Sequence, residues 1–222
     1  MRKAYLLTIL FCLLAFPAEA SPLTEALQKK YASIDSMTAN FTQTLVHKES
    51  GAKQQRSGVL SFKKPLLVRW ETKSPTPELL LVGKDAIWNA FPEEEIAYKY
   101  AIGLAQDSRS IVRVVTGQAR LDQDFTVEEE GREGQSVKLR LYPKEPNQAM
   151  VEALLWVDPS SHLIKKIRAY DFYGNENEIS FSAHNPTVKL PESNFKYSPP
   201  KDFAVEDRTK DKGAAPIKPL MQ

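Results

Sequence analysis

Few residues of this chain could do acid–base or metal chemistry, and they are scattered along it. The three histidines, His47, His162 and His184, lie far apart and lack metal-ligand spacing. We therefore expect surface or strand-edge histidines and no metal site. There is no G-x-S-x-G elbow, no H-E-x-x-H helix and no phosphate-binding glycine loop. The pattern predicts a protein that is not an enzyme and that uses no cofactor.

Carboxylates occur in two runs of three glutamates, residues 93–95 and 128–130. A glycoside hydrolase needs two carboxylates placed across a cleft, and the sequence alone leaves that alternative open. Adjacent glutamates are more typical of solvated turns and strand edges. We expect these two runs to be surface charge.

The N-terminus is predicted to be a cleaved export signal covering residues 1–20. Arg2 and Lys3 precede an apolar run over residues 6–16, and Ala18-Glu19-Ala20 supplies a small-x-small cleavage site after Ala20. The alternative is a retained membrane anchor. A run of eleven residues is too short for it, since a spanning helix needs about twenty.

The only cysteine, Cys12, lies inside this apolar run and follows Phe11, so it cannot serve as a lipidated cysteine at a cleavage site. The mature chain is therefore expected to have neither a disulfide nor a lipid anchor, which suits the periplasm of a Gram-negative bacterium. Residues 1–20 contain two of the 30 basic and one of the 28 acidic residues. The remainder is nearly neutral, which argues against a nucleic-acid partner.

The predicted elements are one amphipathic helix followed by many short strands. Leu23, Leu27, Tyr31 and Ile34 recur at helical spacing. About six strands follow, then a broken helical insert over residues 101–117, then about six more strands joined by turns. This plan indicates a mainly β protein with helices (α+β), built on a large antiparallel sheet or barrel. We expect one domain over residues 21–205 and a disordered tail over residues 206–222.

The hydrophobic pattern leaves two interpretations of the sheet open. Residues 137–141 alternate between apolar and charged side chains, as expected for a sheet with one solvated face. Residues 66–68 and 79–82 are continuously apolar, so both of their faces need cover or one face meets something other than water. An ordinary packed core and an apolar ligand-binding face beneath a helical lid are both compatible with this pattern.

An ordered series of short motifs covers residues 23–207. It begins after the first helix with residues 41–44 (FTQT), 58–60 (GVL) and 62–70 (FKKPLLVRW). It continues through the hairpin at residues 80–88, the D-x-x-G-N turn at residues 171–175 and the closing FKYSPP at residues 195–200. No single motif is decisive, but their order and spacing together are specific, and the series resembles the periplasmic outer-membrane lipoprotein carrier family LolA.

This resemblance implies an unclosed antiparallel β-barrel of about 11 strands with a helical lid over an apolar cavity. It implies a monomeric carrier of acylated lipoproteins. The carrier would receive them from an inner-membrane ABC transporter and pass them to an outer-membrane receptor or acceptor membrane. A regulatory protein that senses a lipid or lipoprotein, or a carrier of another lipid, is the alternative. The family's own lipid-anchored receptor is disfavoured by the missing lipidated cysteine.

The resemblance also implies a lock on the lid. Family members commonly carry an arginine directly before the strand proline, where this chain has Lys64. Lysine lacks the bidentate fork of arginine, so a weaker lock is expected, with Arg69 as a second candidate. Lys64 could instead be an exposed charge at a strand end.

The expected lipid-binding residues are apolar side chains from strands in both halves of the sheet, and the strand face that each occupies is a guess. They are Phe41, Leu60, Phe62, Leu67, Val68, Leu80, Val82, Trp88, Leu139, Leu141, Leu155 and Val157.

Overall fold

The computed structural model describes residues 22–103, 110–145 and 148–210. The expected signal segment, residues 1–20, lies outside the described residues. The described helices are α1 (Pro22–Ser33), α2 (Ile111–Val115) and α3 (Leu121–Asp124), with short 3-10 turns η1 (Pro92–Glu94) and η3 (Glu192–Phe195). No helix in these ranges is both long enough and apolar enough to cross a membrane.

The strands form one twelve-stranded sheet in the order β12-β6-β5-β4-β3-β2-β1-β11-β10-β9-β8-β7. The first half contains β1 (Ser36–Val46), β2 (Lys53–Lys63), β3 (Leu67–Ser74), β4 (Glu78–Val82), β5 (Ala86–Phe91) and β6 (Ile96–Ala101). The second half contains β7 (Phe125–Glu133), β8 (Ser136–Pro143), β9 (Glu152–Val157), β10 (Ile164–Tyr170), β11 (Glu176–Asn185) and β12 (Ala204–Arg208).

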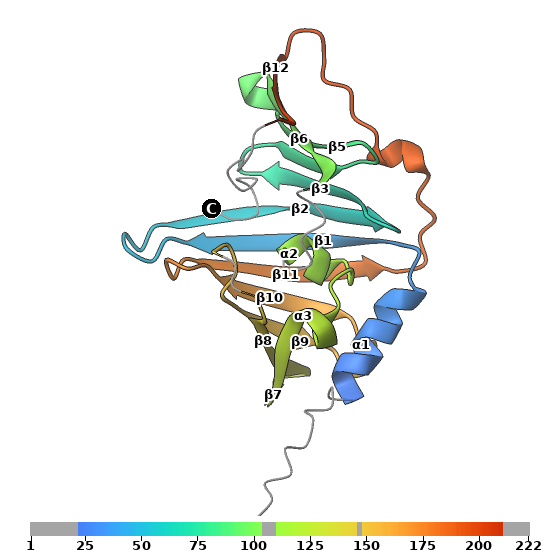
Figure 1. The fold of residues 1–222 in the computed structure, drawn as a ribbon, viewed down its shortest axis with the longest axis vertical. Helices are drawn as coiled ribbons and strands as arrows, with labels where there is room; N and C mark the ends of the chain where they lie inside the picture. The colour runs from blue at the N-terminus through green and yellow to red at the C-terminus, as the bar shows by residue number, and fades with distance from the viewer. Residues whose placement is uncertain (1–21, 104–109, 146–147, 211–222) are drawn as a thin grey trace, which may run out of the picture.

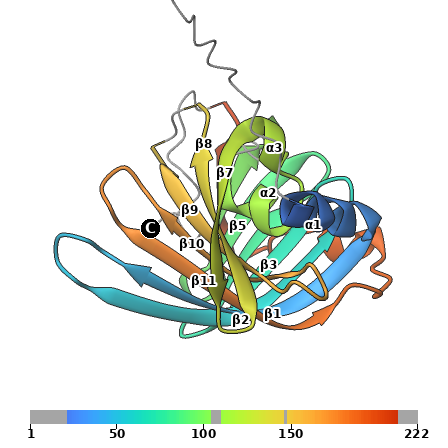
Figure 2. The ribbon, with the colours of Figure 1, turned by 90° about the horizontal axis from the view of Figure 1, so that it is seen from below.

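The sheet curves around the helices without closing on itself (Figures 1 and 2). All neighbouring strands are antiparallel except β12, which pairs with β6 in parallel. Strands β12 and β7 form the two edges. The predicted unclosed antiparallel sheet with few helices is therefore confirmed, with twelve strands in place of about eleven.

Helix α1 forms where helical spacing predicts it and buries Leu27 and Tyr31. It lies inside the curve of the sheet beside α2 and α3 (Figure 2). The Tyr31 ring stacks 6.5 Å from Phe62 of β2, and its hydroxyl accepts a 3.3 Å hydrogen bond from the amide of Ile164. Burying a large apolar side chain contributes about 1.5–3 kcal/mol. This face of the helix therefore fixes α1 to the sheet.

The broken helical insert predicted over residues 101–117 is realised in part. Strand β6 extends to Ala101, residues 104–109 lie outside the described residues, and α2 occupies only Ile111–Val115. Ser110 caps α2 by accepting a 3.3 Å hydrogen bond from the amide of Arg113. Polar N-caps of this kind satisfy an amide at the helix start.

Strand β4 is apolar on both faces because both faces are covered. Leu80 and Val82 join the main core cluster on the concave face. Leu79 and Leu81 lie in a second cluster on the convex face, against Trp88 and two aromatic side chains of the C-terminal segment, Tyr197 and Phe203. The continuous apolar run therefore reflects two cores rather than one face exposed to a ligand.

The C-terminal segment differs from the expected disordered tail. Residues Glu206, Asp207 and Arg208 belong to β12, which pairs with β6. The Arg208 guanidinium lies 4.4 Å from the Tyr98 ring centroid, a cation–π contact that favours this pairing. The sequence does not predict this strand, because an edge strand with exposed side chains shows no alternation of apolar and polar residues. Residues 211–222 lie outside the described residues.

Candidate functional site

A cavity of about 700 Å³ opens on the concave side of the sheet. It lies at the end of the sheet where one turn joins β1 to β2 and another joins β10 to β11. Its apolar lining comes from Leu45 and Val46 of β1, Ile111 of α2, Ala169 of β10, and Met150 and Ala149 before β9. Its polar lining comes from His47, Glu49, Lys53, Gln54, Asp171, Tyr173, Asn175, Glu176 and Asn177, and Ala52 also borders the cavity. This volume is in the range of small-molecule and lipid pockets.

The turn between β10 and β11 builds one part of the polar rim, and the hairpin between β1 and β2 builds another. Asp171 accepts hydrogen bonds from the amides of Tyr173 (2.9 Å) and Asn175 (2.8 Å), and Gly174 adopts a positive φ of 79°. This is the D-x-x-G-N turn of the sequence. The aspartate side chain accepts hydrogen bonds from backbone amides, and glycine adopts the left-handed conformation without a steric penalty. The turn leaves Phe172 and Tyr173 largely exposed.

Helix α2 lies where the cavity meets the main core cluster. Ile111, its first residue, lines the cavity, while Val112, Val114 and Val115 are buried in the cluster. The hydroxyl of Thr116 donates a 2.8 Å hydrogen bond to the carbonyl of Val112. The concave face is therefore packed beneath the helices and hollow beyond them.

Most of the residues expected to bind lipid lie in that packed part. Ten of them belong to the main core cluster: Phe41, Leu60, Phe62, Val68, Leu80, Val82, Leu139, Leu141, Leu155 and Val157. None of these ten lines the open cavity. Sequence reasoning missed the cavity residues Leu45 and Met150. Leu45 could have been found, since it shares the strand parity of Phe41.

Two expected lining residues lie on the opposite face, which corrects their assignment. Trp88 pairs with Leu81 across β4 and β5 and packs 5.6 Å from Tyr197 on the convex side. Leu67 pairs with Lys63 and is one position out of phase with Val68. Successive side chains of a strand alternate between faces, so one step of parity moves a residue across the sheet.

Of the two lock candidates, only Lys64 reaches a helix. Its ammonium group donates a 2.5 Å hydrogen bond to the carbonyl oxygen of Ala32 in α1, and its amide donates to the carbonyl of Asp35 at 2.9 Å. Arg69 shares the convex face with Glu71, whose carboxylate it contacts at 3.4 Å. The geometry therefore does not support Arg69 as a contact that holds the lid.

The residues with catalytic potential are not brought together. His47 lies at the cavity rim and contacts Ser50, His162 occupies the turn after β9, and His184 contacts the carbonyl of Ile164. Burial lowers the pKa of His184. Within the described residues, no group of three His, Cys, Asp or Glu side chains could hold a metal ion.

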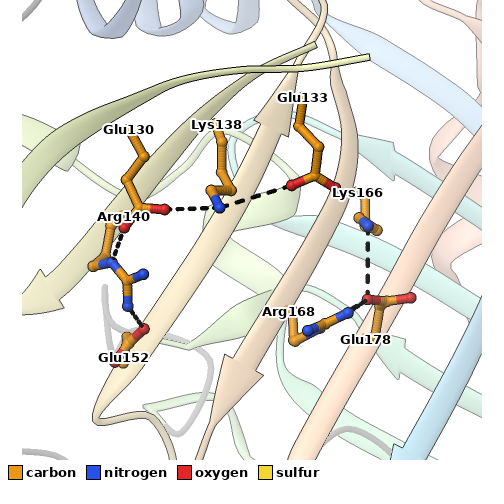
Figure 3. A network of polar contacts seen from close by, with 8 residues as sticks. All are labelled: Glu130, Glu133, Lys138, Arg140, Glu152, Lys166, Arg168 and Glu178. Carbon is orange, nitrogen blue, oxygen red and sulfur yellow. Dashed lines mark hydrogen bonds and ion pairs between the residues drawn. The ribbon is translucent and has the colours of Figure 1, made fainter. Parts of the chain in front are cut away.

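The second glutamate run contributes to a charged network on the convex face (Figure 3). Glu130 of β7 contacts Lys138 and Arg140 of β8, and Arg140 also contacts Glu152 of β9. These contacts lower the pKa of Glu130, chiefly through its hydrogen bond with Arg140. The run therefore supplies surface ion pairs rather than an acid–base pair.

Lys166 and Arg168 of β10 form a second group of ion pairs by sharing the carboxylate of Glu178. The Lys166 ammonium lies 3.7 Å from the ring centroid of Trp156, which is buried beneath it. Long basic side chains can cover apolar surface in this way. Charged side chains thus cover the convex face of this half of the sheet.

Comparison with known families gives one match across most of the chain. Residues 32–198 match the family described as outer membrane lipoprotein carrier protein LolA. The chain is 25% identical over 192 residues to the outer-membrane lipoprotein carrier protein of Chromobacterium violaceum, covering 86% of this chain and 90% of that one. It is 27% identical over 209 residues to the protein of the same name from Serratia proteamaculans, covering 91% and 98%.

Solved structures share the fold at low sequence identity. An uncharacterized conserved protein from Thermus thermophilus superposes with a TM-score of 0.54 and 13% identity, covering 84% of this chain and 97% of that one. At this identity the likeness concerns the fold alone.

Proposed function

Since this chain belongs to the LolA family of outer-membrane lipoprotein carrier proteins, we propose that it binds the acyl chains of lipoproteins and carries them to the outer membrane. It would work in the periplasm of a Gram-negative bacterium as a monomer, after removal of residues 1–20. Its partners would be the inner-membrane ABC transporter that releases the lipoproteins and the receptor or membrane that accepts them. No catalytic step is part of this proposal.

The observation that carries the proposal is the cavity of about 700 Å³ next to an apolar face that three helices cover. Acyl chains would enter at Leu45 and Met150 and extend toward Phe41 and Trp70 when α2 moves away. Phe41 and Trp70 are buried in the core cluster, with their ring centroids 4.8 Å apart. Moving α2 away from the core cluster would expose an apolar surface that only another apolar group could cover favourably.

The energetics require a partner at the loading step. Each CH₂ group of an acyl chain contributes about 0.8 kcal/mol to membrane binding, so a lipoprotein with several chains leaves a bilayer extremely slowly without help. This chain contains no nucleotide-binding motif. The transporter must therefore supply the energy of extraction, and the carrier supplies an apolar surface that replaces the bilayer.

The test is copurification from cells that make the tagged mature protein and a palmitoylated lipoprotein together with an active transporter. A soluble complex of the two is expected. The matched control is the same lipoprotein with its acylated cysteine replaced by serine, which should not copurify. Absence of a complex with the acylated form would overturn the proposal.

Deletion of the gene separates a carrier from a sensor of the same fold. Loss of a carrier should leave outer-membrane lipoproteins in the inner membrane, as measured by membrane fractionation. Correct lipoprotein sorting in the deletion strain, with changed gene expression only, would favour the sensor.

A further inference from the structure

A row of polar side chains crosses the concave face at the cavity end of the sheet. Six neighbouring strands, from β11 through β1, β2, β3 and β4 to β5, contribute one residue each. In this order the residues are Asn177, Gln43, Arg56, Thr72, Glu78 and Asn89. We call this set the polar row.

Strand parity fixes the face on which the polar row lies. Gln43 is two positions from Phe41, and Glu78 is two positions from Leu80, and both of these apolar residues belong to the concave core cluster. Gln43 lies opposite Arg56 in the β1–β2 register, and Glu78 lies opposite Thr72 in the β3–β4 register. Cross-strand partners share a face.

Every side chain of the polar row except that of Arg56 is buried, and most of them are hydrogen-bonded to another member of the row. The Gln43 amide donates to Asn177 Oδ1 at 2.9 Å, and Arg56 Nη1 donates to Glu78 Oε2 at 3.3 Å. In its favoured amide orientation, Asn89 donates to Glu78 Oε1 at 3.1 Å. Gln43 is 0% exposed and Asn89 is 1% exposed. Such groups are costly to bury in an apolar wall.

The polar row meets the cavity at its β11 end and separates the cavity from the core along β1. Asn177 lines the cavity and is opposite Leu45, another lining residue, in the β1–β11 register. One step farther from the cavity, the same face carries Phe41, Trp70 and Leu80 of the core. A molecule that passed along β1 from Leu45 to Phe41 would cross the polar row at Gln43.

Stability alone gives no reason for this arrangement. Apolar residues of similar volume often stabilise a protein as much as a buried ion pair or more. A continuous apolar wall would also be the simplest way to hold hydrocarbon. The polar row instead supplies amide and guanidinium N–H donors, which hydrocarbon cannot use but carbonyl oxygens can.

We propose that the polar row binds the ester and amide carbonyl groups at the root of the acyl chains, which would set how deeply the chains enter. This inference rests on the proposed carrier function and deepens it. The acyl chains would lie beyond the row, against Phe41 and Trp70. The carbonyl groups would accept hydrogen bonds from the row, and the peptide would leave through the cavity.

The test compares two synthetic probes. One is a cysteine peptide that carries two palmitoyl groups as esters and one as an amide, and the other has ethers in place of the esters. Wild-type protein should bind the ester probe about fivefold to tenfold more tightly, since a buried hydrogen bond corresponds to about a fivefold difference. Affinity is measured by displacement of an apolar fluorescent dye from the mature protein.

The variant Gln43→Met/Asn177→Leu replaces one bonded pair by apolar side chains of similar shape. It should lose the ester preference and retain its affinity for the ether probe. Thr42→Val, on the exposed face of the same strand, is the control and should keep the preference. Thr72→Val provides a second variant with minimal change of shape, and its preference for the ester probe should fall about twofold.

The outcomes separate the two proposals. Equal affinity of the wild-type protein for both probes, or an ester preference that survives in folded polar-row variants, would overturn the role of the polar row and leave the carrier function standing. Failure of the wild-type protein to bind either probe would overturn the carrier function itself, and with it this inference.

Discussion

The ammonium group of Lys64, in the turn between β2 and β3, donates a 2.5 Å hydrogen bond to the carbonyl oxygen of Ala32 in the last turn of α1. Carbonyl groups at a helix C-terminus have no partner within the helix and carry partial negative charge, so a cation is favourable there. The contact joins the first helix to the sheet at the position where family resemblance leads one to expect an arginine. Lysine at this position can still reach α1.

Replacing Lys64 by methionine should loosen α1 without unfolding the sheet. The substitution keeps an apolar stem of similar length and removes the donor. A hydrogen bond from a partly exposed charged group is worth about 1 kcal/mol, so amide exchange near the end of α1 should rise about fivefold. Hydrogen exchange followed by mass spectrometry measures this change directly.

Two further variants give this prediction its controls. Lys64→Arg should keep or improve the protection of α1, because arginine also donates and presents a fork. Lys73→Met, an exposed lysine on β3, should leave α1 unchanged. If Lys64→Met exchanges at the wild-type rate, Lys64 is only a charge at a strand end.

Glu78 makes part of the stability depend on pH. Burial raises the pKa of Glu78 from 4.5 to about 6, against the opposing attraction of Arg56. The folded protein therefore holds this proton more tightly than the unfolded chain does. The contribution of Glu78 to stability is full below about pH 4.5 and is lost as the pH rises through about 6.

The variant Glu78→Gln should remove this dependence. The free energy of unfolding of the variant minus that of wild type should increase by about 2 kcal/mol from pH 4 to pH 7. A shift of one pKa unit corresponds to about 1.4 kcal/mol. Urea unfolding at a series of pH values gives the difference. Glu129→Gln, an exposed carboxylate on β7, should follow the wild-type curve. A constant difference between Glu78→Gln and wild type would contradict the prediction.

The parts of the fold that depend on local pattern could be predicted from the sequence. The helical spacing of Leu27 and Tyr31 predicts α1, and alternation from Val137 to Leu141 predicts an amphipathic strand whose apolar side joins the core. The ordered motifs predict the unclosed sheet. These signals are local, because the spacing of apolar residues within one element shows which of its faces is buried.

The parts that depend on long-range pairing could not be predicted. The apolar run of β4 has the same sequence pattern whether its second face meets lipid or meets Tyr197, which is far away in the chain. The polar row appears only when the register brings Gln43, Arg56 and Glu78 together. The sequence leaves the parity of Trp88 undetermined, because the β5 run AIWNAF carries apolar residues on both of its faces.

Leu45 should be needed for acyl-chain binding although no motif points to it. Its side chain is 7% exposed and lines the cavity. Leu45→Glu would place a carboxylate in the wall, and a buried charge without a partner costs several kcal/mol. Affinity for the palmitoylated ester probe should fall at least about tenfold. Thr42→Glu, on the exposed face of β1, is the matched control. Wild-type affinity in Leu45→Glu would exclude this cavity as the entry site.

Gly117 should be indispensable for the packing of α2 against α1. It follows α2 with a positive φ of 68°, and a Cβ atom there would overlap the Cβ and the ring of Tyr31, which is buried. Gly51 has nearly the same φ, 67°, and a Cβ atom added to it would meet no other atom within 4 Å. Both alanine variants adopt a left-handed conformation, at a cost of about 1–2 kcal/mol.

Only Gly117→Ala adds an overpacking cost, which is about 1–3 kcal/mol in a well-packed core. The difference between Gly117→Ala and Gly51→Ala in the free energy of unfolding, measured in urea, should therefore be at least about 1 kcal/mol. Amide exchange in α2 should increase in Gly117→Ala alone, because relief of the clash must displace either the end of α2 or the ring of Tyr31. Equal costs for the two variants, with equal exchange in α2, would show that the α1–α2 contact yields without strain and cannot hold the lid closed.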